Sequence, residues 1–306
     1  MSITRIAVGV DGYPEGRDAV VLGVALAGAT HAELMLVSVH PDPLVVLPQG
    51  MNWKSLRGQA EEILHEIRNS LAPGSRTAVE TDFSVARALQ RVVDRERREL
   101  LVVGSSRHAP DGHVRIGKRT RQLLCHSESA LAIAPRGMHE QTDVQIQSVG
   151  VGYDGGPEAQ AALALAAEIA GGCGAKLLVR GVVDDRIHEL GWSRLGTGAV
   201  IDPTPGWSAV GSDGVTADWD ELVQATEKSL RARVDESLVE IGATAESEVV
   251  QGRPATALLE LSEQVDLLVI GSRRWGPVAR LVLGSTGEAV LHDATCSVLV
   301  VPRPPE

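Results

Sequence analysis

RIAVGVDGYPEG, at residues 5–16, returns in altered form as SVGVGYDGGPEA at residues 148–159. A shift of 143 positions places Asp11 on Asp154, and the Gly, Pro and Glu that follow also match. In both stretches a short apolar run ends in Asp-Gly, and a proline then opens a segment with helical spacing. This order is typical of a buried strand that turns directly into a helix.

The far ends of the two copies match as well. Residues 104–135 align with 271–302 without a gap at a shift of 167. The 24 extra positions (167 minus 143) indicate an insertion in the second copy, and the Gly-, Asp-, Pro- and Trp-rich segment 184–219 is its predicted place. The sequence therefore predicts a duplicated domain. The predicted boundaries are 1–138 for the first domain, 136–147 for a polar linker and 147–306 for the second domain.

Each copy alternates short apolar stretches with segments of helical spacing. In the second copy the predicted strands are 148–154, 175–183, 245–252, 266–272 and 296–302. The predicted helices are 157–172, 220–242, 254–265 and 283–294. This alternation predicts an α/β fold of two tandem doubly wound domains, each with a five-stranded parallel sheet covered by helices on both faces. Apolar residues make up 43% of the chain and aromatics only 3%, so the cores are expected to be aliphatic.

Composition limits the classes of function. A net charge of −11 makes nucleic acid and anionic membranes unfavourable partners. No apolar run is long enough to cross a bilayer, and the first residues lack the layout of a secretory signal. The three cysteines form no CxxC pair, which indicates reduced, mostly buried thiols in a cytoplasmic protein and no zinc site.

A ligand crevice is expected at the carboxyl ends of the strands. Asp11 or Asp154 ends the first strand of each copy, and Gly-Ser ends the fourth, at 104–105 and 271–272. A carboxylate can accept hydrogen bonds from ribose hydroxyls, whereas a Gly-Ser bend and a helix start offer N–H groups to an anion. The alternative for each aspartate is an ordinary Asp-Gly turn in which the carboxylate caps the following helix.

This strand plan, with Asp after the first strand and Gly-Ser after the fourth, resembles the universal stress protein family as a tandem pair of adenine nucleotide alpha hydrolase-like domains. ATP-binding members carry Gly, two residues, Gly, nine residues, Gly, then Ser or Thr. On the second copy this motif gives Gly271, Gly284 and Ser285, with Thr286 as a further hydroxyl and Arg274 in place of the second glycine. The Arg274 side chain either crowds the phosphates or binds them through its guanidinium.

The resemblance also implies a Gly-x-Pro turn beside the base pocket, at Gly252 and Pro254. The nucleotide contacts predicted for the second copy are Asp154, Gly155, Val182, Gly252, Pro254, Gly271, Ser272, Arg274, Gly284, Ser285 and Thr286.

The first copy has a degenerate version of the motif. Lys118 stands at the Ser position and Arg119 matches Thr286, so two hydroxyls that would support metal-assisted phosphate binding are replaced by cations. With Arg115 these cations compensate in part, and whether this copy binds nucleotide stays open. A lone cluster of this kind in an acidic chain favours a local phosphate or an acidic partner. The contacts predicted here are Asp11, Gly12, Val39, Gly104, Ser105, Gly117, Lys118 and Arg119.

The resemblance implies an ATP-binding stress-response or signalling factor that uses ATP, with or without Mg²⁺, and turns over little or none of it. Three alternatives stay open: a slow ATPase or adenylyl-transferring enzyme, a nucleotide-free scaffold, and a cyclic AMP binder. The apolar last strand of each copy is expected at a sheet edge that pairs with another strand. Because the family dimerises through this strand, the two halves are expected to meet there, and a homodimer of the whole chain stays open.

Overall fold

The structure is a computed structural model that describes residues 2–40, 53–126, 129–184, 219–274, 281–282 and 284–302. Its first half contains β1 (Arg5–Val10), α1 (Pro14–Thr30), β2 (Glu33–His40), α2 (Trp53–Leu71), β3 (Arg76–Thr81), α3 (Val85–Arg95), β4 (Leu100–Gly104), α4 (Lys118–His126) and β5 (Ala130–Ala134). The short 3₁₀ helix η1 (Met138–Glu140) follows in the linker.

The second half contains β6 (Ser148–Tyr153), α5 (Pro157–Cys173), β7 (Lys176–Val183), α7 (Trp219–Ile241), β8 (Glu246–Gln251), α8 (Pro254–Ser262), β9 (Leu267–Gly271), β10 (Arg273–Arg274), β11 (Leu281–Val282), α9 (Ser285–Asp293) and β12 (Ser297–Val301). Every strand and helix predicted for this half is present. The antiparallel β10–β11 pair was not predicted, because two-residue strands carry no period that a sequence pattern can show. Residues 185–218, which hold most of the predicted insertion, lie outside the described residues.

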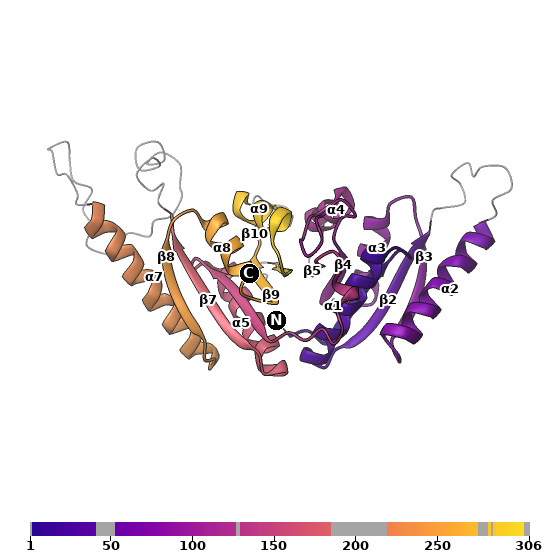
Figure 1. The fold of residues 1–306 in the computed structure, drawn as a ribbon, viewed down its shortest axis with the longest axis horizontal. Coiled ribbons are helices and arrows are strands. Elements are labelled where there is room, and N and C mark those ends of the chain that lie inside the picture. Colours follow the sequence, from indigo (N-terminus) through magenta and orange to yellow (C-terminus); the bar gives the residue numbers. More distant parts are fainter. Residues whose placement is uncertain are drawn as a thin grey trace.

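One ten-stranded sheet runs through both halves in the order β3-β2-β1-β4-β5-β12-β9-β6-β7-β8 (Figure 1). Within each half all neighbouring strands are parallel, with the first strand between the second and the fourth. This is the predicted doubly wound α/β fold. The halves join where β5 pairs antiparallel with β12, so the two last strands meet as expected.

Helices cover both faces of the sheet. Apolar residues of α1, α2, α5 and α7 form one buried cluster, and those of α3, α4, α8 and α9 form the other. Figure 1 shows α2 and α7 at opposite ends of the molecule and α1 and α5 near its middle. Both clusters are almost entirely aliphatic, as the composition predicted. None of the helices in the described ranges is long and apolar enough to cross a membrane.

The linker between the halves is tied to α1 by Asp18. This side chain is 0% exposed. One of its carboxylate oxygens accepts the Gly137 amide at 3.0 Å, and the other accepts the His139 amide at 2.8 Å and lies 2.6 Å from Nδ1 of the His139 ring. A carboxylate in helix α1 therefore satisfies the backbone at the start of the linker.

Two cysteine thiols occupy contrasting places. Cys173 is exposed at the end of α5, so the expectation of burial is wrong for it, whereas Cys296 is buried beside β12. Burial raises the pKa of the Cys296 thiol to about 12, and the thiolate that reacts with alkylating agents is therefore scarce at pH 8. We expect iodoacetamide to modify Cys173 in the native protein and Cys296 only after unfolding, as read by peptide mass spectrometry. Equal rates at the two thiols would contradict the packing around Cys296.

Candidate functional site

The predicted contacts of both halves fall at the carboxyl ends of the strands or at helix starts beside them. In the first half they comprise the bend after β1 (Asp11, Gly12), the end of β2 (Val39), the end of β4 (Gly104, Ser105) and the start of α4 (Gly117, Lys118, Arg119). In the second half they comprise the bend after β6 (Asp154, Gly155), the end of β7 (Val182), the β8–α8 turn (Gly252, Pro254), the end of β9 with β10 (Gly271, Ser272, Arg274) and the start of α9 (Gly284, Ser285, Thr286).

The acidic bend and the Gly-Ser bend lie side by side in each half. A Cβ built on Gly104 would stand 2.0 Å from the carbonyl oxygen of Glu15, in the first turn of α1. A Cβ on Gly271 would stand 2.7 Å from the matching oxygen of Glu158 in α5. The helix that follows the acidic bend therefore rests against the end of the fourth strand, which the crevice hypothesis requires. These glycines have a packing role that is independent of any ligand.

Each acidic bend also stabilises its own turn. Asp11 accepts the Tyr13 amide at 3.3 Å, and Asp154 accepts the Gly156 amide at 2.9 Å. The glycines that follow them, Gly12 and Gly155, have φ angles of 76° and 79°, which a side chain would strain. The Asp-Gly turn is therefore present in both halves, but neither carboxylate caps the following helix, because each accepts the amide of the residue that precedes the helix, Tyr13 or Gly156. Since both aspartates remain exposed, the same carboxylates can also face a ligand.

The electrostatics of Asp11 link the bend to the start of α4. Asp11 is exposed as a whole residue, but protein atoms around its carboxylate displace water, and this desolvation raises its pKa. The Tyr13 amide opposes the shift, Glu15 adds to it, and the positive charge of Arg119 opposes it. The charge of Arg119, in the first turn of α4, thus acts on the Asp11 carboxylate.

The Gly-Ser bend of the first half is largely satisfied from within. The buried Ser105 hydroxyl accepts the Arg115 amide at 2.6 Å and lies 3.3 Å from two carbonyl oxygens, of His113 and Arg115. The Ser106 amide also donates within the loop, to the Arg115 carbonyl at 2.8 Å, so neither the Ser105 hydroxyl nor the Ser106 N–H group of this bend is left for a ligand. Lys118 and Arg119 remain exposed at the start of α4.

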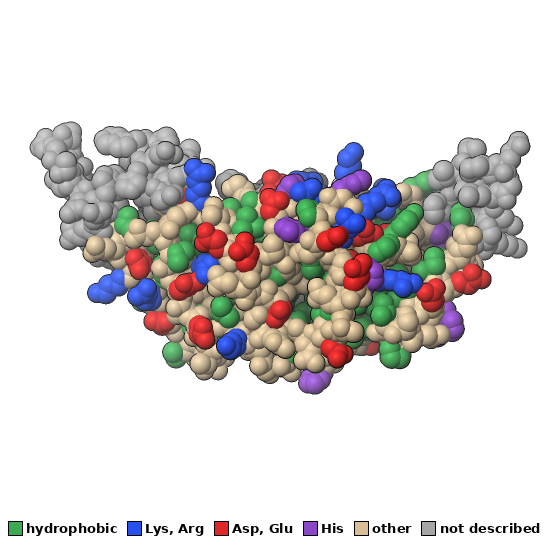
Figure 2. All heavy atoms as spheres, viewed as in Figure 1, with side chains coloured by type: hydrophobic (Ala, Val, Ile, Leu, Met, Phe, Trp, Pro, Cys, Tyr) green, Lys and Arg blue, Asp and Glu red, His purple; other side chains and the backbone are tan. Residues whose placement is uncertain are grey.

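The basic segment around α4 contacts the second half. Arg121 forms a 2.6 Å ion pair with Glu288 of α9, and Arg115 lies 3.9 Å from Asp293. Basic and acidic side chains are interspersed over the face shown in Figure 2. Part of the predicted acidic partner of this segment is therefore the second half of the same chain.

The second half presents a more open helix start. Gly284 precedes α9, and among the described residues no atom lies within 4 Å of its would-be Cβ and no side chain caps the helix. Ser285 is exposed and Thr286 is half-buried at the first two helical positions. The Ser272 hydroxyl is buried and has no hydrogen-bond partner within the described structure. Arg274 lies in β10, and the conformation of its side chain is outside the described part, so its predicted role stays a prediction.

The turn after the third strand of each half, which the family resemblance places beside the base of the nucleotide, differs between the halves. Gly252 has a φ of 143°, and Pro254 opens α8. In the first half Ser84 caps α3 by accepting the Arg87 amide, and the preceding Phe83 is 62% exposed. The two halves therefore differ in the residues that follow their third strands, β3 and β8.

Two helix side chains that cover the acidic bends were not found by sequence reasoning. Arg233 of α7 donates to the Gly155 carbonyl at 2.6 Å, and its guanidinium carbon would be 2.6 Å from a Cβ on Gly155. In the first half Ile63 of α2 takes this place, 2.9 Å from a Cβ on Gly12. Neither residue stands out within an amphipathic helix pattern, so no sequence signal separates it from ordinary surface positions.

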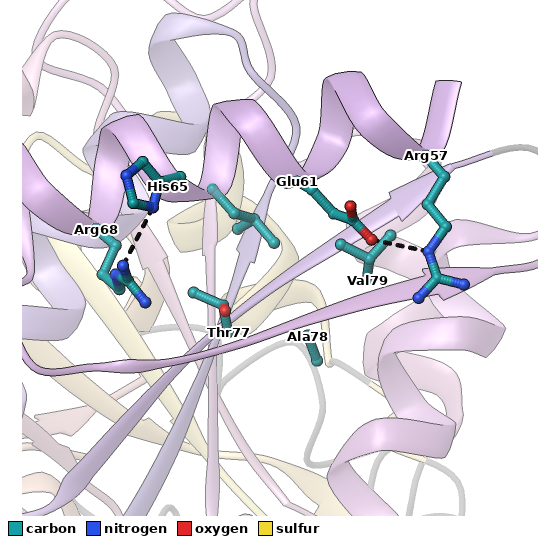
Figure 3. Close-up of a pocket in the computed structure, with 8 residues that line it drawn as sticks. Arg57, Glu61, His65, Arg68, Thr77, Ala78 and Val79 are labelled. Carbon is teal, nitrogen blue, oxygen red and sulfur yellow. Dashed lines mark hydrogen bonds and ion pairs between the residues drawn. The ribbon is translucent and has the colours of Figure 1, made fainter. Parts of the chain in front are cut away.

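A separate groove of 490 Å³ lies between α2 and the edge strand β3 (Figure 3). Its charged walls pair internally, Arg57 with Glu61 at 2.8 Å and Arg68 with the His65 ring at 3.1 Å. It is remote in the fold from the start of α4, because β1 and β2 lie between β3 and β4 in the sheet. Among the described residues no group of three or more His, Cys, Asp or Glu side chains is arranged to hold a metal ion.

The fold and its bends together define a class: two doubly wound α/β domains in tandem, each with an acidic bend and a Gly-Ser bend at the carboxyl ends of its strands. The model of the universal stress protein family matches residues 2–135 and 202–302. The chain belongs to this family.

Relatives of similar length match this chain over nearly its whole length. Universal stress protein Rv1996 of Mycobacterium tuberculosis is 26% identical over 336 residues, which cover 98% of this chain and 96% of the relative. A universal stress protein of Mycolicibacterium smegmatis is 26% identical over 306 residues, with 97% and 96% covered. The crystal structure of a universal stress protein from Archaeoglobus fulgidus matches with a TM-score of 0.64 and 18% identity over 98% of both chains, which supports the fold.

Proposed function

We propose that this chain binds ATP in the crevice of its second half and acts as a nucleotide-dependent stress-response or signalling factor. One observation carries the proposal: the acidic bend at Asp154 and the bend at Gly271 and Ser272 lie at the same end of the sheet, in contact through the first turn of α5. Two chemically different recognition elements thereby lie next to each other, an arrangement that suits a ligand with a ribose at one end and phosphates at the other.

Each part of the second crevice suits one part of ATP. The Asp154 carboxylate is a ribose acceptor, and the uncapped N–H groups at the start of α9 suit a phosphate group. Gly284 leaves room for close approach of that phosphate. The Ser285 and Thr286 hydroxyls offer oxygen ligands of the kind that Mg²⁺ prefers. These residues fit a nucleotide bound with or without the metal.

The first half is the weaker site in this proposal. Its Ser105 hydroxyl is engaged with the backbone, and the charge of Arg119 already acts on Asp11. Lys118 and Arg119 offer charge to a phosphate but no hydroxyl ligand to a metal. Phe83 and Ser84 also replace the more open turn at Gly252.

The proposal is tested by calorimetric titration of ATP into the purified chain, with Mg²⁺ and with a chelator. We expect Asp154→Ala to weaken ATP binding about tenfold or more, because a hydrogen bond to a charged group contributes roughly 1.5–3 kcal/mol. Asp11→Ala is the matched control and should leave the tighter binding step unchanged. Absence of saturable heat at millimolar ATP, or identical curves for the parent and Asp154→Ala, would reject ATP binding in this crevice.

Turnover is measured separately by steady-state phosphate release. The proposed role requires binding to saturate at concentrations where release stays near background. Many turnovers per chain would favour the ATPase alternative, and displacement of ATP by low cyclic AMP concentrations would favour the cyclic nucleotide.

A further inference from the structure

The two halves are related by an approximate two-fold axis that passes between β5 and β12. In their antiparallel pairing Ala132 stands opposite Leu299, and these residues are 167 positions apart, the shift that relates the two copies. Ile133 pairs with Val298 and Leu131 with Val300 on either side. A residue that pairs with the equivalent residue of the other copy lies on the two-fold axis. Ala132 and Leu299 are such a pair, so the axis passes between them in the sheet.

The axial pair in the sheet combines a small and a large side chain. Ala132 and Leu299 are both 0% exposed and belong to the apolar cluster beneath α1 and α5. We call the contact surface of the first half, with Ala132, first-type and that of the second half, with Leu299, second-type. Two first-type surfaces would place Ala against Ala and leave a void. Two second-type surfaces would place Leu against Leu and overfill the same space. Only the unlike pair fills the space as observed.

The axial pair on the α4 and α9 face combines opposite charges. Arg121 and Glu288 are also 167 positions apart, and they form the 2.6 Å ion pair between the two halves. Two copies of the first surface would oppose two arginines, and two copies of the second would oppose two glutamates. Like charges at such a distance repel.

The third axial pair lies where α1 contacts α5. Ala29 and Gly172 are related by the shift of 143 that applies to this part of the repeat. A Cβ on Gly172 would stand 1.7 Å from the Ala29 carbonyl oxygen. The close approach of the two helices therefore requires glycine on the side of α5, and an alanine at both positions would force them apart.

We propose that these three axial pairs determine partner specificity: the surface formed by α1, α4 and β5 fits the surface formed by α5, α9 and β12, and each rejects a copy of itself. Size, charge and backbone clearance each break the two-fold symmetry at the place where a symmetric pairing would bring identical residues together. The partner of each half is thus the unlike half. If the two copies had diverged without selection for their mutual contact, pairs that do not fit each other would be as frequent on the axis as the three complementary pairs.

The test uses the full chain with the axis made symmetric in two ways. Glu288→Arg with Leu299→Ala gives the second half first-type residues, and Arg121→Glu with Ala132→Leu gives the first half second-type residues. We expect each double variant to lower the midpoint of thermal unfolding by about 5 °C or more. The chain with all four substitutions restores unlike pairs and is expected to recover at least half of the summed loss.

The charge pair gives an independent measurement if the size variants fail to fold, because both side chains are about half exposed. Arg121→Glu and Glu288→Arg are each expected to lower the midpoint by about 1–3 °C, and the charge exchange to restore most of it. The control joins Glu288→Arg to Arg17→Glu, which breaks an exposed ion pair with Glu66 away from the axis; these effects should simply add. If the midpoint changes of Arg121→Glu and Glu288→Arg also simply added in the chain that carries both, the proposal would be overturned.

Discussion

A chain with Gly104→Ala is expected to lose roughly 3 kcal/mol of unfolding free energy and about 6–10 °C in its unfolding midpoint. The reason is the contact that joins the two parts of the first crevice. The new Cβ would stand 2.0 Å from the Glu15 carbonyl oxygen and 2.7 Å from its carbon. Both are backbone atoms held in the first turn of α1, so relief requires a shift of the helix and not a change of rotamer.

Gly117→Ala is the matched control, because it adds the same methyl group to the same loop system. The nearest atom to its would-be Cβ is 3.9 Å away, which is ordinary contact. Its cost should be about 1 kcal/mol or less, from the weaker helix start that alanine provides. Urea unfolding of the two variants measures the difference. Equal losses would show that the strand end and α1 are not in tight contact.

This contrast separates two reasons for a glycine within one motif. Sequence reasoning assigned Gly104 and Gly271 to a ligand-facing bend, whereas the structure gives both of them a packing reason as well. Later in the same motif, the nearest atom to a Cβ on Gly117 is at an ordinary contact distance of 3.9 Å, and no atom of the described residues lies within 4 Å of a Cβ on Gly284. A bound phosphate needs space beside a helix start, so we propose that the later glycines, rather than Gly104 and Gly271, are the ones that phosphate binding requires.

The sequence predicted the fold well because the strand and helix patterns are local, and each pattern occurs twice, once in each copy of the repeat. The Asp-Gly bends and the Gly-Ser bends follow from positions along the chain, whereas the pairing of the last strands was implied by the family resemblance. Contacts made by lone residues across the fold could not be predicted in this way. Arg233 over Gly155 is one of them, and Asp18 is another, since the second copy has Ala161 at that position and offers no repeated signal.

Removal of the Asp18 carboxylate is expected to cost about 3 kcal/mol or more of unfolding free energy. Asp18→Ala leaves the amides of Gly137 and His139 without their acceptor, and each buried donor left unpaired costs roughly 1–3 kcal/mol. It also breaks the contact between the carboxylate and the His139 ring. Urea unfolding measures the loss, and limited proteolysis should cut the linker at 136–147 faster than in the parent chain, because its first residues lose their attachment to α1.

His139→Ala is the control that isolates the backbone contacts. It removes the ring but keeps the two amides that donate to Asp18, so its cost should be clearly smaller than that of Asp18→Ala. The linker contact matters for the whole molecule, because η1 lies directly between β5, at the junction of the halves, and the start of β6. A carboxylate with no counterpart in the second copy is thus positioned to hold the connection where the repeat symmetry is broken. Equal losses for the two variants would instead assign the stabilisation to the histidine ring.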